Sequence, residues 1–186
     1  MNVATATAAA PVPLDPGARG WSLAAGALAL LPLLLTLPPG LATGLGLAAA
    51  ATAAIAWRHP FPGWLRVALT LAMIAAVFAV MGARLGRDTG SALLAAMLAI
   101  KPSELRSLRD ARSLVGFALF APFAAFLLDQ GPLVMASALV AVLAGLLALQ
   151  RLADLEGGVG ALALPQRLGT IGRLVAIGLP LALAAF

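Results

Sequence analysis

The chain has 186 residues, of which 62% are hydrophobic and 10% are charged, and its mean hydropathy is +1.04. An average soluble domain is about 25% charged, so this composition indicates an integral membrane protein. The absence of cysteine excludes disulfides and thiolate catalysis within the chain, and the basic residues behind the net charge of +5 are too scattered for a nucleic-acid-binding patch.

The first 20 residues are small, dotted with proline and poor in large apolar side chains. Such a segment cannot bury enough apolar surface to fold alone, so we predict a disordered cytoplasmic tail over residues 1–20 and a multi-span transmembrane domain over residues 21–186. The apolar run 21–37 follows a single arginine, Arg19, and no small-residue cleavage site follows it. A signal anchor is therefore favoured over a cleaved signal peptide.

Further apolar runs follow, bounded by charge, proline or glycine, at residues 41–57, 67–83, 89–100, 113–128, 132–150 and 174–186. A helix needs about 17 residues or more to cross a bilayer, so the run 89–100 and the last run are short. The sequence predicts an all-α polytopic transmembrane bundle of about seven helices, with a short fourth helix and a truncated last one. Because a helix that ends within the bilayer leaves carbonyls unsatisfied, we expect the natural protein to continue beyond Phe186.

The placement of charge predicts the orientation of these helices. If the tail is cytoplasmic and all seven runs cross, ten of the 12 basic residues lie in cytoplasmic segments and only Arg84 and Arg87 lie outside. This is the bias that the positive-inside rule describes. The three tryptophans, Trp21, Trp57 and Trp64, also fall at cytoplasmic ends, where an interfacial belt would place them. A re-entrant fourth run would degrade this pattern, so seven spans are preferred.

Glycines four residues apart mark two places in the chain. Gly82, Gly86 and Gly90 form one series, and Gly40 and Gly44 form another. This spacing predicts either a helical face for close helix contact or a flexible loop, and both alternatives stay open.

The fourth run is followed by the charged stretch KPSELRSLRDAR, residues 101–112. Pro102 biases Lys101 away from the α conformation, so we expect the membrane helix to end or kink there. After it, Leu105 and Leu108 fall on one face, which predicts a short amphipathic surface helix.

The charged residues around the fourth run could pair with one another. Arg84 can pair with Asp88, Glu104 with Lys101 and Asp110 with Arg106, or Glu104 and Asp110 can lock neighbouring loops together. The simpler alternative is a charged loop whose only role is to set the membrane topology of the helices beside it. We take seven residues as structural or interface candidates: Arg87, Asp88, Lys101, Glu104, Arg106, Arg109 and Asp110.

The order G-R-x-x-G, an apolar run and then K-x-x-E-L-R-x-x-R-D resembles the N-terminal membrane domain of the TgpA-type transglutaminase-like proteins of bacteria. The motif falls on Gly86, Arg87, Gly90, Lys101, Glu104, Leu105, Arg106, Arg109 and Asp110. The resemblance implies a bacterial inner-membrane protein whose N-terminal helices precede a periplasmic transglutaminase-like domain with a Cys-His-Asp triad, followed by another helix. Pro102 departs from the family pattern, because an apolar helix former is expected at that position.

Catalytic chemistry is not expected within the chain itself. It has no cysteine, its one histidine, His59, lies in a proline-rich turn, and no metal-ligand or phosphate-loop motif occurs, so no cofactor is predicted.

The leading hypothesis is therefore a non-catalytic inner-membrane anchor whose partners are the bilayer and the protein's own C-terminal periplasmic domain. The full-length protein would resemble an acyltransferase or cysteine protease. The alternative is a small transporter or channel, which requires polar residues along several helix faces. A third hypothesis, an enzyme acting through Arg87, Asp88 and Glu104, is weakened because these charges are predicted on opposite sides of the membrane.

Overall fold

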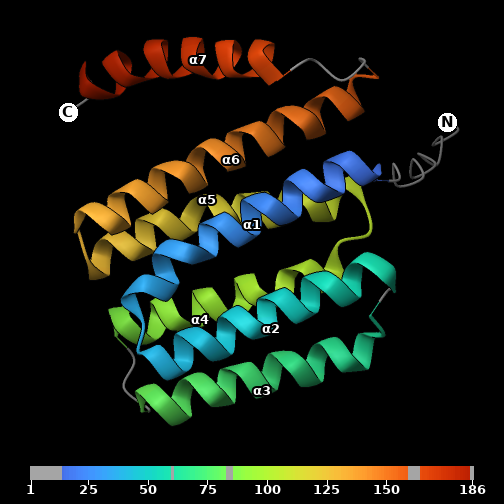
Figure 1. The fold of residues 1–186 in the computed structure, drawn as a ribbon, viewed down its shortest axis with the longest axis vertical. Coiled ribbons are helices and arrows are strands. Elements are labelled where there is room, and N and C mark those ends of the chain that lie inside the picture. The colour runs from blue at the N-terminus through green and yellow to red at the C-terminus, as the bar shows by residue number, and fades with distance from the viewer. Residues whose placement is uncertain (1–13, 60, 83–85, 159–163, 185–186) are drawn as a thin grey trace, which may run out of the picture.

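The computed structural model of the protein describes residues 14–59, 61–82, 86–158 and 164–184, and these residues form helices and no strands. The elements in chain order are α1 (Pro16–Thr36), α2 (Pro39–Arg58), α3 (Gly63–Met81), α4 (Arg87–Ile100), the 3₁₀ turn η1 (Lys101–Glu104), α5 (Leu108–Leu128), α6 (Pro132–Glu156) and α7 (Leu164–Ala184). Consecutive α-helices run in opposite directions with nearly parallel axes (Figure 1). The predicted all-α bundle is confirmed.

The first helix begins earlier than the sequence suggested. Pro16 occupies its first position, where the missing N–H costs nothing, and Asp15 Oδ1 accepts a hydrogen bond of 2.8 Å from the backbone N of Ala18. Residues 16–20 therefore belong to α1 and not to a disordered tail, because an aspartate cap and a proline start the helix there. Residues 1–13 lie outside the described part of the chain.

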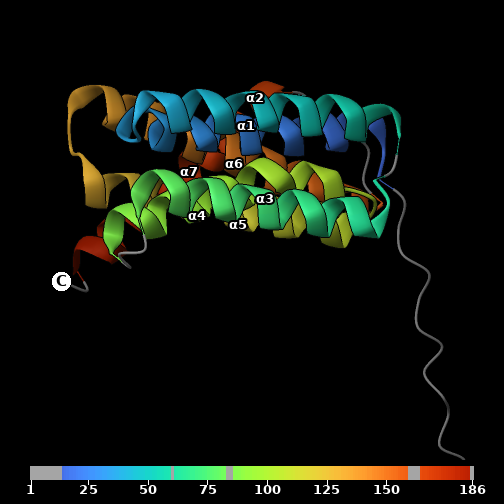
Figure 2. The ribbon, with the colours of Figure 1, turned by 90° about the horizontal axis from the view of Figure 1, so that it is seen from below.

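Helix α1 lies at the centre of the bundle. It packs against α2, α4, α5 and α6, and α6 also packs against α5. Together α1 and α2 form a layer over α3, α4 and α5 (Figure 2). At opposite edges of the bundle, α3 packs mainly on α4 and α7 on α6 (Figure 1). The edge helices therefore contribute little to the core.

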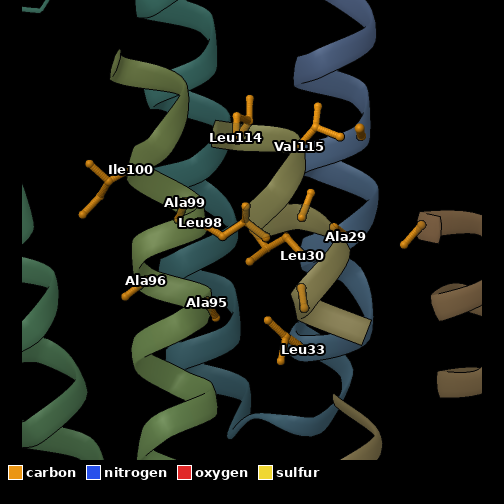
Figure 3. Packing of buried hydrophobic residues seen from close by; sticks show 14 of the residues in the cluster. Ala29, Leu30, Leu33, Ala95, Ala96, Leu98, Ala99, Ile100, Leu114 and Val115 are labelled. Carbon is orange, nitrogen blue, oxygen red and sulfur yellow. The ribbon is translucent and has the colours of Figure 1, made fainter. Parts of the chain in front are cut away.

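Small side chains bring the central helices together. Along α1, the buried residues Ala18, Ser22, Ala25 and Ala29 recur every three or four positions, and α5 and α6 bury alanines in the same rhythm. This spacing keeps small residues on one helical face and lets backbones approach closely. Figure 3 shows where α1, α4 and α5 meet, with side chains that include Ala29, Leu30, Leu33, Ala95, Leu98, Ala99, Leu114 and Val115.

The short fourth helix is a buried one. At 14 residues α4 is about 21 Å long, less than the ~30 Å of a hydrocarbon core, and more than half of its residues are buried among α1, α2, α3 and α5. Irregular backbone is tolerated at membrane depth where protein surrounds it. The shortness of the fourth helix, predicted as the run 89–100, is confirmed, and its burial explains how a short helix is accommodated.

Five helices, α1, α2, α3, α5 and α6, are long and apolar enough to cross a bilayer. Large apolar side chains cover their outer faces, as at Leu47, Leu71, Phe120, Phe123 and Leu139, which are all more than half exposed. A surface of this kind suits lipid and would be an aggregation hazard in water. The chain therefore has the properties of a helical membrane protein.

The glycines that the sequence marked for helix contact are not contact sites. A methyl group placed at Gly40, Gly44, Gly86 or Gly90 would meet no atom within 4 Å, and Gly82 ends α3 with φ of 74°. The close approaches occur at Gly26, where the added carbon would lie 3.2 Å from Leu114, and at Gly145, where it would lie 2.7 Å from Leu119. Of the two alternatives for the marked glycines, close helix contact is therefore not found, because glycine spacing alone does not show which face meets a neighbour.

Candidate functional site

Most of the basic residues gather at one end of the bundle, where α1, α3, α5 and α7 begin and α2, α6 and η1 end (Figure 1). We call this the basic end and define it by Arg19, Arg58, Arg66, Lys101, Arg106, Arg109, Arg112, Arg151 and Arg167. The sequence predicted that these residues share one side, and the alternating helix directions bring them together. Positively charged side chains at one end of a helical bundle favour an orientation with that end on the cytoplasmic side of a membrane.

The other end of the bundle holds the first two candidate residues. Arg87 and Asp88 begin α4 and form an exposed ion pair of 3.5 Å, and Arg87 also donates to the carbonyl of Leu127 at 3.4 Å. An exposed pair of this kind contributes little to stability. The expected partner of Asp88, Arg84, lies outside the described residues.

Lys101 and Glu104 form the ion pair that the sequence predicted. Their Nζ and Oε2 atoms lie 2.7 Å apart within η1, and the ammonium group also lies 5.3 Å from the centre of the Phe117 ring. The ring face attracts the cation, so Lys101 ties η1 to α5. Glu104 is occupied locally and does not lock a neighbouring loop.

Asp110 caps its own helix and does not pair with the Arg106 side chain. Its Oδ2 atom accepts hydrogen bonds from the backbone N of Arg106 at 3.2 Å and of Ser107 at 3.0 Å, while Ser107 Oγ accepts from the backbone N of Asp110 at 3.3 Å. This reciprocal arrangement is a capping box at the start of α5. The predicted pair and the predicted loop lock are both corrected, because the unsatisfied N–H groups of the first turn bind the carboxylate.

No separate amphipathic surface helix forms after Pro102. The chain makes the four-residue turn η1, passes through an extended Leu105 and enters α5 at Leu108. Leu105 and Leu108 are both buried, so their side chains pack into the core and do not lie on the surface of the bundle. The sequence placed both leucines on one face of a surface helix, but the connection is too short to be a helix of its own.

The interhelix contacts of this connection come from arginines that donate to backbone carbonyls. Arg106 donates to the carbonyl of the buried Phe61 at 2.5 Å, just before α3. Arg19 of α1 donates to the carbonyls of Ala56 in α2 at 2.6 Å and of Leu105 at 3.3 Å. Ala56 lies in the last turn of α2, where carbonyls lack a partner within the helix, and Phe61 and Leu105 lie in connections between helices. Two arginines therefore join four segments of the chain.

Arginine–carboxylate pairs join the remaining helices at the basic end. Arg151 of α6 pairs with Asp15, the cap of α1, at 2.5 Å, and Arg112 of α5 makes a two-pronged contact with Glu156 at the end of α6. Their partners lie 136 and 44 positions apart in sequence. Sequence reasoning missed these pairs because nothing in local spacing signals a contact of such range.

Arg109 and His59 take no part in this set of contacts. Arg109 is exposed and makes no hydrogen bond or ion pair to any residue that the structure describes. His59 is exposed at the end of α2, and no group of three or more potential metal ligands occurs among the described residues. Neither residue has the surroundings of a catalytic group.

Comparison with known proteins gives the family. A family model described as the TgpA N-terminal domain matches residues 21–186. The chain belongs to this family. A relative from Pseudomonas aeruginosa, named protein-glutamine gamma-glutamyltransferase, is 35% identical to this TgpA N-terminal domain over 162 residues, which cover 80% of the chain and 24% of the relative. The domain therefore spans about a quarter of that relative's length, and no solved structure matches it.

The charged motif of this TgpA N-terminal domain marks the two ends of a buried helix. Its first part, Gly86 and Arg87, lies at the start of α4, and its second part begins at Lys101, where α4 passes into η1. About 21 Å of helix separates the two parts. The seven charged candidates therefore do not form a single site, and the two groups lie at opposite ends of the bundle.

Proposed function

We propose that this TgpA N-terminal domain is a non-catalytic anchor in the bacterial inner membrane that holds a periplasmic catalytic part of a longer protein. One observation carries the proposal: large apolar side chains cover the outer faces of the bundle, and most of the basic residues gather at one end. Lipid solvates such a surface, and the cytoplasmic side of a membrane retains such an end.

In this orientation the basic end faces the cytoplasm. Trp57 and Trp64 are exposed at that end, at the depth where aromatic rings favour the headgroup region. All seven helices cross in the proposed arrangement, with the short α4 shielded by its neighbours. In this arrangement the end of α7 lies on the periplasmic side.

The catalytic groups belong outside this domain in the proposed arrangement. The chain contains no cysteine, whereas the resemblance implies a thiolate nucleophile for the attached domain. The relative's name refers to glutamyl transfer, and this domain corresponds to 24% of its length. We infer that transfer takes place on the part of such a protein that follows the membrane helices.

A transporter would need a polar path through the bundle, and the described interior favours packing. Alanine and leucine fill the core, and buried polar side chains are few: Ser22, Thr52, Thr89, Ser91, Ser103 and Arg167 among the described residues. Ser22 and Thr52 donate to backbone carbonyls within or between helices, which is a structural use of a hydroxyl.

A domain exchange tests the anchor. In the full-length protein, residues 21–186 are replaced by an unrelated membrane segment that ends on the periplasmic side. We expect a glutamyl-transfer assay in membranes to retain activity, because the anchor supplies position only. Loss of activity in an exchanged protein that is still exported and folded would show that these helices take part in catalysis or substrate passage.

A further inference from the structure

A cavity of about 240 Å³ opens at the basic end between the start of α1, the end of α2 and the η1–α5 connection. Its lining includes Arg19, Arg58, His59, Ser103 and Arg106 and no acidic residue. A single water needs only about 10–15 Å³, so the cavity has room for a larger polar group. A lining with guanidiniums and a hydroxyl but no carboxylate has the chemistry that suits an anion.

The carboxylates closest in sequence to the lining residues have other partners. Asp15 pairs with Arg151, Glu104 pairs with Lys101, and Asp110 caps α5. Among the described residues, no carboxylate forms an ion pair with any of the three arginines that line the cavity. Arg19 and Arg106 donate to backbone carbonyls, but no carboxylate among the described residues neutralises the positive charge of the three arginines.

Two buried polar atoms on lining residues have no hydrogen-bond partner among the described residues. They are the hydroxyl of Ser103, a residue only 3% exposed, and Nε of Arg19. Buried donors are nearly always satisfied, because leaving one unpaired costs free energy. Both residues line the cavity, so the two unused donors lie close behind its wall.

The position of the cavity favours a lipid as the source of the anion. Trp57 lines the cavity and is about half exposed, and its ring lies 5.7 Å from the Arg19 guanidinium. An interfacial tryptophan and guanidiniums together suit a headgroup whose chains lie along the helix.

We propose that the cavity binds a phosphate group, and that its source is the headgroup of an anionic phospholipid such as phosphatidylglycerol. The bound phosphate accepts hydrogen bonds from the guanidiniums and from Ser103, and it bridges α1, α2 and the entry to α5. The lipid as source rests on the proposed membrane function, whereas the phosphate site itself rests on the cavity.

Binding is measured on the full-length protein in phosphate-free detergent, with phosphatidylglycerol, phosphatidylcholine and inorganic phosphate as separate probes. We expect tighter binding of phosphatidylglycerol than of phosphatidylcholine. Ser103→Ala and Arg58→Gln are each expected to weaken it about tenfold, the loss of one charge-assisted hydrogen bond. Arg109→Gln is the matched control, since Arg109 is exposed at the same end and does not line the cavity.

The outcomes separate the possible sources. Binding of inorganic phosphate alone, weakened by Ser103→Ala, would support the phosphate site and overturn the lipid as its source. Equal losses in Arg58→Gln and Arg109→Gln with none in Ser103→Ala would overturn the site in favour of diffuse attraction to an anionic surface. Carbonate extraction reports membrane insertion independently: an embedded protein that binds neither probe would overturn the site and leave the anchor intact.

Discussion

Arg167 of α7 and Asp154 of α6 form an ion pair of 2.5 Å with side chains that are only 6% and 15% exposed. It is the most buried of the ion pairs described in the chain, and it lies where α7 packs on α6. Since α7 packs mainly on α6, the pair has a large share in holding the last helix. Removing one partner leaves a buried charge without its counterion.

Asp154→Asn is expected to lower the free energy of unfolding by about 3 kcal/mol, the usual cost of breaking a buried pair. Thermal unfolding of the detergent-solubilised protein, followed by size-exclusion chromatography, measures the effect. The matched control is Glu104→Gln, which breaks a pair whose carboxylate side chain is 40% exposed and whose loss is expected to cost less than about 1 kcal/mol. Equal shifts in the two variants would contradict a structural role for the Arg167–Asp154 pair.

The capping box at the start of α5 gives a second prediction. Ser107→Ala removes the acceptor for the backbone N of Asp110 and is expected to cost about 1 kcal/mol. The control is Ser113→Ala in the same helix, which removes a hydroxyl from a position inside α5, where alanine favours the helix. If urea or thermal unfolding shows no difference between the two variants, the box does not stabilise α5.

The close approach of α6 and α5 gives a third prediction. Gly145→Leu places a side chain where a first carbon already lies 2.7 Å from Leu119, and overpacking of this kind costs about 1–3 kcal/mol. Gly116→Leu in α5 is the control, because nothing lies within 4 Å of that position. The expected result is a lower melting temperature for Gly145→Leu only, and an unchanged melting temperature for both variants would contradict the tight packing of α6 on α5.

Apolar runs predicted the helices, and the basic residues predicted which helix ends lie on the same side of the bundle. Both patterns can be recognised without knowledge of the tertiary structure. The Lys101–Glu104 pair was predicted for the same reason, as its members are three residues apart. Even the early start of α1 at Pro16 carried a local signal, the Asp-Pro pair that typically begins a helix.

Long-range geometry could not be predicted from the sequence. A lock formed by Glu104 and Asp110 was one of two alternatives, but the contacts that join distant segments come from residues such as Arg19, Arg106 and Arg151. Arg19 binds a backbone carbonyl 37 positions away, and every residue has a carbonyl, so no residue type in the sequence signals this contact. The choice of Gly26 and Gly145 as close contacts likewise depends on which faces meet.

The absence of cysteine makes the orientation of the domain directly measurable. Single substitutions Arg109→Cys at the basic end and Gln130→Cys in the exposed α5–α6 connection place one thiol at each end of the bundle. A membrane-impermeant maleimide applied to intact spheroplasts is expected to label Gln130→Cys, and to label Arg109→Cys only after the membrane is permeabilised. Labelling of Arg109→Cys in intact spheroplasts, with Gln130→Cys protected, would contradict a cytoplasmic basic end and with it the proposed anchor.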